Sequence, residues 1–359
     1  MILNTKGTIN NGRQIELDVA RGLAVIFMVC VHLLITFGNV YTQFSSTYGQ
    51  IVQFLGGIPA APVFMFLLGV GIVYSKKTRP GLLAKRGAIL IASGYILNIF
   101  RSFIPAYINA LSLNDRPIDV SSIFFYNFFF VDILQFAGLA MLFFAVAIKW
   151  NFSKRTYFLT LILFVIANLI IKTLSFGDDA DVAPIFALVF GGELSYFPFL
   201  TWITYPIVGY FFGTYLIQTE DKRSFYNRIF LNTLAFLIIY SFLIVFFQFP
   251  TGYESDQLYY HHTFPINLFF IGFILFWLSC LFFLTNSLSK VRWRLLKSAS
   301  TLTTEIYVGH FLFIGLYSTL IQSSLGLSSI ILLTAFTYLI SHYIAFVYAK
   351  KEKVRRIIK

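Results

Sequence analysis

Long apolar runs separated by short polar segments dominate the hydrophobic pattern of this chain. A helix that crosses the hydrocarbon core of a bilayer needs about 20 apolar residues. We therefore predict an all-α integral membrane protein with about ten transmembrane helices, at residues 18–40, 53–75, 82–106, 124–148, 156–174, 197–218, 229–249, 264–286, 301–321 and 327–349. The apolar segment 181–192 is shorter, which favours a re-entrant or interfacial piece; an eleventh span there is the alternative.

Basic residues are concentrated in every second connection between these runs. They cluster before the first span and after the second, fourth, sixth, eighth and tenth, whereas the other connections hold few basic residues and several acidic ones. Because cytoplasmic loops carry the excess of Lys and Arg, this pattern predicts that the N and C termini are both cytoplasmic. An even number of spans follows from the same alternation, and the bacterial inner membrane is the expected location.

Composition agrees with a membrane protein. Of the 359 residues, 58% are hydrophobic and 12% are charged, whereas soluble domains carry about 25% charged residues. The net charge of +12 is explained by the basic loops, so we expect contact with membrane lipids and no nucleic-acid partner. Cys30 and Cys280 lie in apolar segments and indicate packing, and no metal site is predicted. We expect no cleavable signal peptide and one membrane domain, residues 1–359; homo-oligomerisation is left open.

The first apolar segment carries three ionisable residues, Asp18, Arg21 and His32. Such groups are costly at membrane depth, so each is a functional candidate. Arg21 and His32 are eleven residues apart, which corresponds to three helical turns plus about 20°, and Asp18 lies close to the same stripe. His32 is then about 16 Å deeper than Arg21. A pair of Asp18 with Arg21 near the cytoplasmic surface is expected from their spacing.

Further polar residues in or beside the spans are candidates for substrate binding. They are Asn98 and Arg101 on one face at the outer end of the third span, Asp132 and Gln135 on one face of the fourth, His310 in the ninth, and His262 in an outer loop. Alternatives remain for several of them: Arg101 could snorkel to the headgroups, and one interhelical hydrogen bond would explain His310. For His262 the alternative is an ordinary solvated loop, since no metal-ligand spacing surrounds it.

Several motifs resemble those of a known family. Leu17-Asp-Val-Ala-Arg-Gly-Leu-Ala24 followed by His32 is similar to the first span of bacterial relatives of heparan-α-glucosaminide N-acetyltransferase, and more distantly to the acyltransferase-3 family. Four later segments resemble the same proteins in the same order: Pro59–Gly69, Asp132–Gly138, Pro198–Gly213 and Thr304–His310. The likeness covers most of the chain.

This resemblance implies transfer of an acyl group, with acetyl-CoA or another acyl-CoA as donor, to a hydroxyl or amine of an extracytoplasmic glycan or envelope molecule. Loop 41–52 has no histidine, so the acyltransferase-3 pattern assigns the catalytic role to His32, with Asp18 and Arg21 along the donor path. An imidazole titrates near neutral pH, which suits a general base or a transient acyl carrier. The alternatives are a proton-coupled transporter of a small anionic or lipid-linked substrate and a non-catalytic envelope component.

Overall fold

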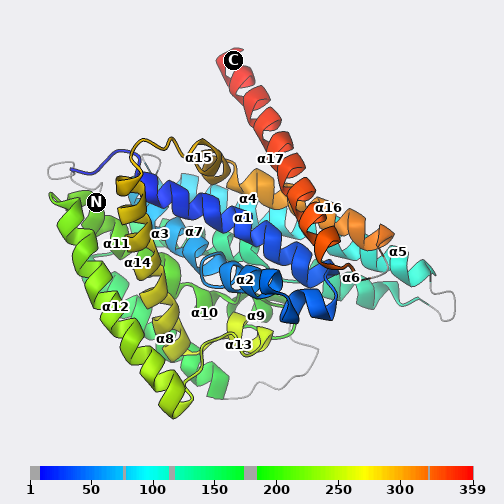
Figure 1. The fold of residues 1–359 in the computed structure, drawn as a ribbon, viewed down its shortest axis with the longest axis horizontal. Helices are drawn as coiled ribbons and strands as arrows, with labels where there is room; N and C mark the ends of the chain where they lie inside the picture. The colour runs from blue at the N-terminus through cyan, green and yellow to red at the C-terminus, as the bar shows by residue number, and fades with distance from the viewer. Residues whose placement is uncertain (1–8, 76–77, 113–117, 174–183, 322–323, 359) are drawn as a thin grey trace. The chain divides into compact units, whose positions relative to one another are not determined.

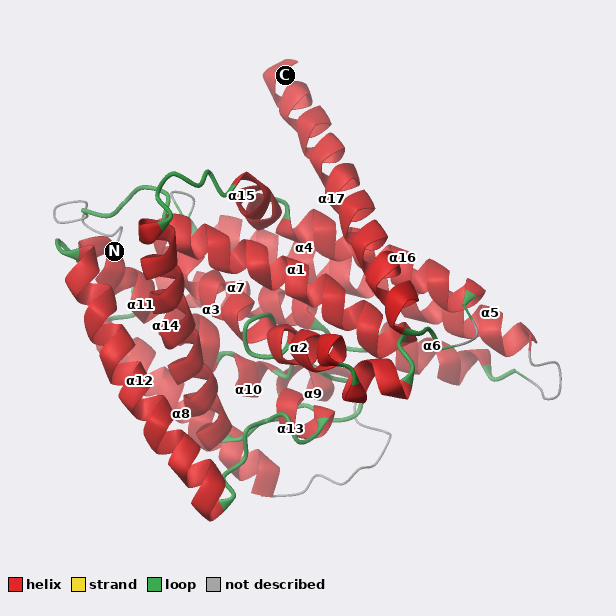
Figure 2. Ribbon diagram, viewed as in Figure 1, coloured by secondary structure: helices red, strands yellow, loops and turns green. Residues whose placement is uncertain are grey.

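The computed structural model describes residues 9–75, 78–112, 118–173, 184–321 and 324–358. Every regular element in these ranges is a helix (Figures 1 and 2). The first half of the chain forms α1 (Ile15–Phe37), the π-helix η1 (Tyr41–Ser45), α2 (Thr47–Gly56), α3 (Ala61–Tyr74), α4 (Pro80–Asn98), the π-helix η2 (Ile99–Phe103), α5 (Ile104–Ser112), α6 (Val120–Phe128), α7 (Ile133–Lys149) and α8 (Lys154–Thr173). The second half forms α9 (Pro184–Val189), α10 (Phe199–Trp202), α11 (Thr204–Gln218), α12 (Lys222–Phe247), α13 (Asp256–Tyr260), α14 (Phe264–Ser287), α15 (Arg294–Thr301), α16 (Thr303–Leu320) and α17 (Leu327–Ile358).

The prediction of an all-α membrane protein is confirmed. Within the described ranges, eight helical stretches are long and apolar enough to cross a bilayer. They correspond to eight of the ten predicted spans, and the other two correspond to α7 and α16. The helix α7 is shorter, with 17 residues, and α16 carries more polar residues along its 18-residue length. The chain is therefore an integral, multi-pass membrane protein.

One predicted span differs from its expected form, and the segment 181–192 holds a short helix, as its length predicts. The expected helix at 124–148 is interrupted: α6 ends at Phe128, and α7 starts at Ile133. Between them, the backbone N–H of Val131 donates to the Leu194 carbonyl at 2.7 Å, and its carbonyl accepts from Tyr196 N–H at 3.0 Å. In segment 181–192 the described residues contain only the six-residue helix α9, which is too short to cross a bilayer.

The chain forms two compact units, each built from three separate stretches of sequence. Unit 1 comprises Met1–Arg13, Pro62–Tyr95 and Phe129–Phe283, and unit 2 comprises Gln14–Ala61, Ile96–Phe128 and Leu284–Lys359. Because the stretches alternate along the sequence, neither unit corresponds to one continuous half of the chain.

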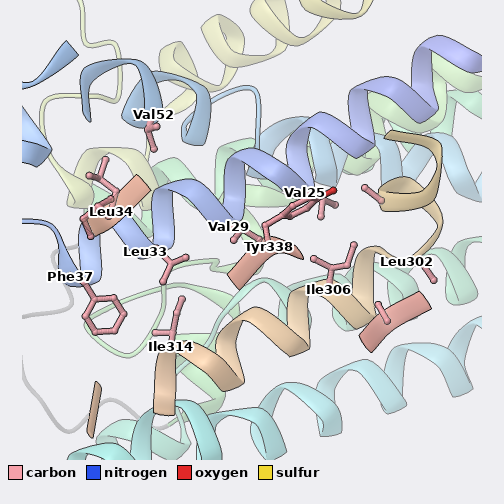
Figure 3. Close-up of a cluster of buried hydrophobic side chains, with 13 residues drawn as sticks. Val25, Val29, Leu33, Leu34, Phe37, Val52, Leu302, Ile306, Ile314 and Tyr338 are labelled. Carbon is pink, nitrogen blue, oxygen red and sulfur yellow. The ribbon is translucent and has the colours of Figure 1, made fainter. Parts of the chain in front are cut away.

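The core of unit 2 lies where α1, α16 and α17 pack together (Figure 3). On α1, Val25, Val29, Leu33 and Phe37 recur every four residues and are buried. This spacing places them on one face of the helix. Burial of these side chains holds α1 against the C-terminal helices and fixes the depth of the polar residues that share α1.

Unit 1 contains reciprocal glycine contacts between helices. A Cβ atom added to Gly69 of α3 would lie 1.8 Å from the Pro206 carbonyl oxygen of α11, and one added to Gly209 of α11 would lie 2.0 Å from the Phe66 carbonyl oxygen. Gly69 and Gly209 both belong to the motifs described above. Their role in the structure is close helix packing, as small residues provide in membranes.

Candidate active site

Two histidines from opposite ends of the sequence meet inside unit 2. Nδ1 of His32 on α1 lies 3.0 Å from Nε2 of His310 on α16. The ring planes differ by 7° and the ring centroids are 5.3 Å apart, so the rings lie nearly edge to edge in one plane. His310 is fully buried. This geometry is that of a direct hydrogen bond between the two imidazoles.

The partners of His310 determine which nitrogen of His32 carries the proton when both rings are neutral. Nδ1 of His310 lies 3.1 Å from the carbonyl oxygen of Ile306, which can only accept, so this nitrogen is the donor. A neutral imidazole has one donor and one acceptor nitrogen. Nε2 of His310 therefore accepts from the Nδ1–H of His32, and Nε2 of His32 carries the lone pair that a general base needs.

The apolar pattern of α16 explains why His310 lies in this position. Ile306, His310 and Ile314 are spaced four residues apart, and the two isoleucines pack into the core opposite α1 (Figure 3). His310 thus replaces an apolar residue on the buried face of α16. A polar group buried in this way is costly unless it is hydrogen-bonded, and His32 together with the Ile306 carbonyl provides those bonds.

An aromatic ring connects the histidine pair to Arg101. The Phe311 ring centroid lies 4.7 Å from that of His32 and 4.3 Å from that of His310. The guanidinium carbon of Arg101 lies 4.4 Å from the Phe311 centroid, within the range of a cation–π contact. The Phe311 ring thus contacts both the His32 imidazole and the Arg101 guanidinium. Sequence reasoning missed Phe311, because one phenylalanine of 44 carries no distinguishing signal.

Asn98 and Arg101, predicted to share a face, are hydrogen-bonded to each other. Nε of Arg101 donates to Oδ1 of Asn98 at 3.0 Å, and Nδ2 of Asn98 donates to the Phe128 carbonyl oxygen at 2.9 Å. Arg101 belongs to the π-helix η2, a rare conformation that often occurs at functional sites. A Cβ atom on Gly315 of α16 would lie 2.9 Å from the Arg101 Cα, so this glycine permits η2 to approach α16.

The N-terminal end of α1 is held by α15. The carboxylate of Asp18 accepts a hydrogen bond from the Ser300 hydroxyl at 3.1 Å. A Cβ atom on Gly22 would lie 2.3 Å from the Leu296 carbonyl oxygen, so α15 packs directly on the backbone of α1. Arg21 is half-buried on the same helix. Since α1 is uninterrupted from Ile15 to Phe37, the predicted helical stripe from Asp18 to His32 is present.

Asp132 and Gln135 belong to unit 1 and are not on the face of a continuous span. Asp132 is the N-cap of α7: its carboxylate accepts from the Ile133 N–H at 2.6 Å, and the Gln135 side chain accepts from the Asp132 N–H at 3.2 Å. The Asp132 side chain also accepts from the backbone N–H of Gln135. Together with the bond from Asp132 N–H to the Gln135 side chain, this makes a capping box, which satisfies backbone donors at a helix start. The sequence Asp-x-x-Gln before an apolar run is the signal that indicates it. A role for either residue in substrate binding stays a prediction.

His262, also in unit 1, is fully buried, unlike a residue of a solvated loop. Its Nε2 lies 2.7 Å from the Tyr205 hydroxyl and 3.0 Å from Oδ1 of Asn267. Its Nδ1 lies 2.7 Å from the Tyr259 carbonyl oxygen. This network connects the loop before α14 to α11. Substrate binding by His262 stays a prediction.

The described residues contain no group of three or more His, Cys, Asp or Glu side chains arranged to hold a metal ion. The histidine pair offers an imidazole base, and the Arg101 guanidinium contacts the same Phe311 ring as both histidines. Such a pair can remove a proton from one reactant while a cation stabilises developing negative charge.

One comparison with known proteins identifies a related group. A family model described as "Heparan-alpha-glucosaminide N-acetyltransferase, catalytic" matches residues 13–248, well over half of the chain. The matched range includes Asp18, Arg21, His32 and Arg101, whereas His310 lies beyond it. No curated protein matches the chain.

Proposed function

Since the chain belongs to the heparan-α-glucosaminide N-acetyltransferase catalytic family and is a transmembrane acetyltransferase, we propose that its donor is an acyl-CoA, with acetyl-CoA as the first candidate. The proposed acceptor is a hydroxyl or amine of an extracytoplasmic glycan or other envelope molecule. The observation that carries the proposal is the 3.0 Å contact between His32 and His310, because it leaves a lone pair on Nε2 of His32.

In the proposed reaction, Nε2 of His32 removes the proton from the acceptor hydroxyl or amine as that atom attacks the thioester carbon. The carbon–sulfur bond then breaks, and the thiol of CoA leaves with the proton held by His32. His310 is a positioning residue that fixes the proton on Nδ1 of His32. Arg101 would stabilise the negative oxygen of the tetrahedral intermediate, and its hydrogen bond to Asn98 keeps the guanidinium in place beforehand.

The donor is proposed to approach along the stripe that leads from Asp18 past Arg21 to His32. Arg21 would bind a phosphate of CoA, since guanidinium groups suit phosphate geometry. The basic loops support an orientation with both termini in the cytoplasm, which places the start of α1 on the side where acyl-CoA is available. The bacterial inner membrane is the proposed location, because the motif of the first span resembles that of bacterial relatives of the family.

A direct test uses the purified full-length protein in detergent with radiolabelled acetyl-CoA and glucosamine as the acceptor probe. We expect CoA release that depends on glucosamine, and a loss of about 100-fold or more in His32→Ala, the range of general-base catalysis. His261→Ala is the matched control, because it removes a histidine outside the proposed site, and should keep its activity.

Two results would contradict the proposal. A wild-type protein that fails to bind acetyl-CoA would exclude this donor. A folded His32→Ala variant with full activity would exclude His32 as the base.

A further inference from the structure

A second hydrogen-bonded histidine cluster lies in unit 2 and has no part in the transfer proposed above. His342 of α17 contacts two hydroxyl groups: Nε2 lies 2.8 Å from the Ser298 Oγ, and Nδ1 lies 3.0 Å from the Tyr338 hydroxyl. Tyr338 is one turn before His342 on α17, and its ring is nearly perpendicular to the imidazole, at 83°. Ser298 is on α15, so the cluster joins two helices.

This arrangement matches the geometry of an activated nucleophile. In such sites a hydroxyl lies within hydrogen-bond reach of a base, and a third group orients that base. Both contacts of His342 join a ring nitrogen to a hydroxyl. In the tautomer with the proton on Nδ1, the Tyr338 oxygen accepts from Nδ1–H and Nε2 accepts from the Ser298 hydroxyl. Ser298 and His342 are half-buried, so each residue keeps some exposed surface. Tyr338, whose hydroxyl contacts the imidazole, is buried.

The surroundings of Ser298 favour an anionic substrate. Four basic residues lie within the eight positions before it: Lys290, Arg292, Arg294 and Lys297. The first three are exposed. A concentration of one charge sign raises the local concentration of oppositely charged ligands. Phosphates of an acyl-CoA are such ligands, and this choice of substrate rests on the function proposed above.

We propose that Ser298 is a nucleophile, with His342 as its base and Tyr338 as a positioning residue, and that it hydrolyses an acyl thioester. The Ser298 oxygen bonds to the thioester carbon, its proton passes to His342, and the carbon–sulfur bond breaks as the sulfur takes that proton and leaves as a thiol. Water then attacks the acyl-serine ester. Its proton returns through His342 to the serine oxygen, and a carboxylic acid is released.

The first experiment treats the full-length protein in detergent with a biotin-tagged fluorophosphonate, which forms a bond with activated serines and releases fluoride. Peptide mass spectrometry should find the adduct on Ser298. We expect no adduct in Ser298→Ala. Labelling should be at least about 100-fold slower in His342→Gln, because glutamine cannot act as the base. In Tyr338→Phe, which loses the hydroxyl that orients the imidazole, labelling should be about tenfold slower. Ser318 is the matched control, because its hydroxyl donates to the Ile314 carbonyl; it should carry no adduct, and Ser318→Ala should label normally.

A second measurement separates this proposal from the transferase. His32→Ala should lose transfer to glucosamine but keep labelling and keep the slow release of CoA from acetyl-CoA without acceptor. Ser298→Ala should lose that acceptor-independent release. Absence of an adduct on wild-type Ser298, or wild-type labelling in His342→Gln, would overturn the proposed nucleophile. Labelling without release of CoA that depends on Ser298 would overturn the acyl thioester as its substrate.

Discussion

Replacing His310 by leucine tests whether the histidine pair sets the reactivity of His32. The change removes the acceptor that lies 3.0 Å from Nδ1 of His32 and leaves that N–H inside a buried region. An unsatisfied buried donor costs about 1–3 kcal/mol. If that cost falls on the transition state, at about 1.36 kcal/mol for each tenfold change in rate, kcat should fall by about fivefold to about 150-fold.

The assay is steady-state release of CoA, with the folded fraction measured separately by thermal unfolding in detergent. KM for acetyl-CoA should remain unchanged, because His310 does not bind the donor in the proposed mechanism. His310→Gln is the matched control: its amide oxygen can accept from Nδ1–H of His32, so it should recover much of the rate. Equal rates in wild type and His310→Leu, or equal losses in the leucine and glutamine variants, would refute the reasoning.

Three further predictions concern other contacts. Arg101→Lys keeps the positive charge but loses the hydrogen bond from Nε to Asn98, so kcat for CoA release should fall about tenfold. An unchanged kcat would argue against positioning of the residue 101 side chain by Asn98. Gly209→Ala puts a Cβ 2.0 Å from a backbone oxygen of α3, so thermal unfolding should show a loss of stability of about 1–3 kcal/mol. The control Gly309→Ala, whose new Cβ has its nearest contact at 3.4 Å, should be as stable as wild type. At Glu254, partial burial opposes ionisation, but hydrogen bonds from the Thr251 and Gly252 backbone outweigh it and lower the pKa. The ionised carboxylate therefore stabilises the fold above pH 4.5, its ordinary pKa, and this contribution is lost as the pH falls through the lower folded pKa. In thermal unfolding, wild type should be more stable than Glu254→Gln at neutral pH, and this difference should disappear below the folded pKa. A stability difference that does not change with pH would contradict the prediction.

The sequence predicts the features that depend on local pattern. Long apolar runs identify the membrane class, and the spacing of Asn98 and Arg101 correctly places them on one helical face. The interruption at 129–132 was missed, because apolar residues on both sides of Asp132 hide a capping box inside one hydrophobic run. A hydropathy average over about 20 residues stays high across the break between α6 and α7, so it does not reveal the interruption.

Contacts between distant helices lie beyond what a single sequence reveals. His32 and His310 are 278 positions apart, and helical periodicity gives the buried face of each helix without naming its partner. Each histidine is recognisable as a costly polar group at membrane depth. Their meeting follows from how α1 and α16 pack, as does the position of Ser298 beside His342.

The composition of unit 2 from both ends of the chain has a consequence for biosynthesis. A ribosome releases α1 long before α15, α16 and α17, and these three helices pack against α1, together with α2, in the finished unit. During synthesis, α1 must therefore wait in the bilayer with its polar residues facing temporary partners, such as lipid headgroups, insertion factors or chaperones. Pairings between such distant segments form late and slowly. A nascent chain stopped after residue 248 would lack the segment that carries His310, so the enzyme would gain its histidine pair only after α16 has been synthesised.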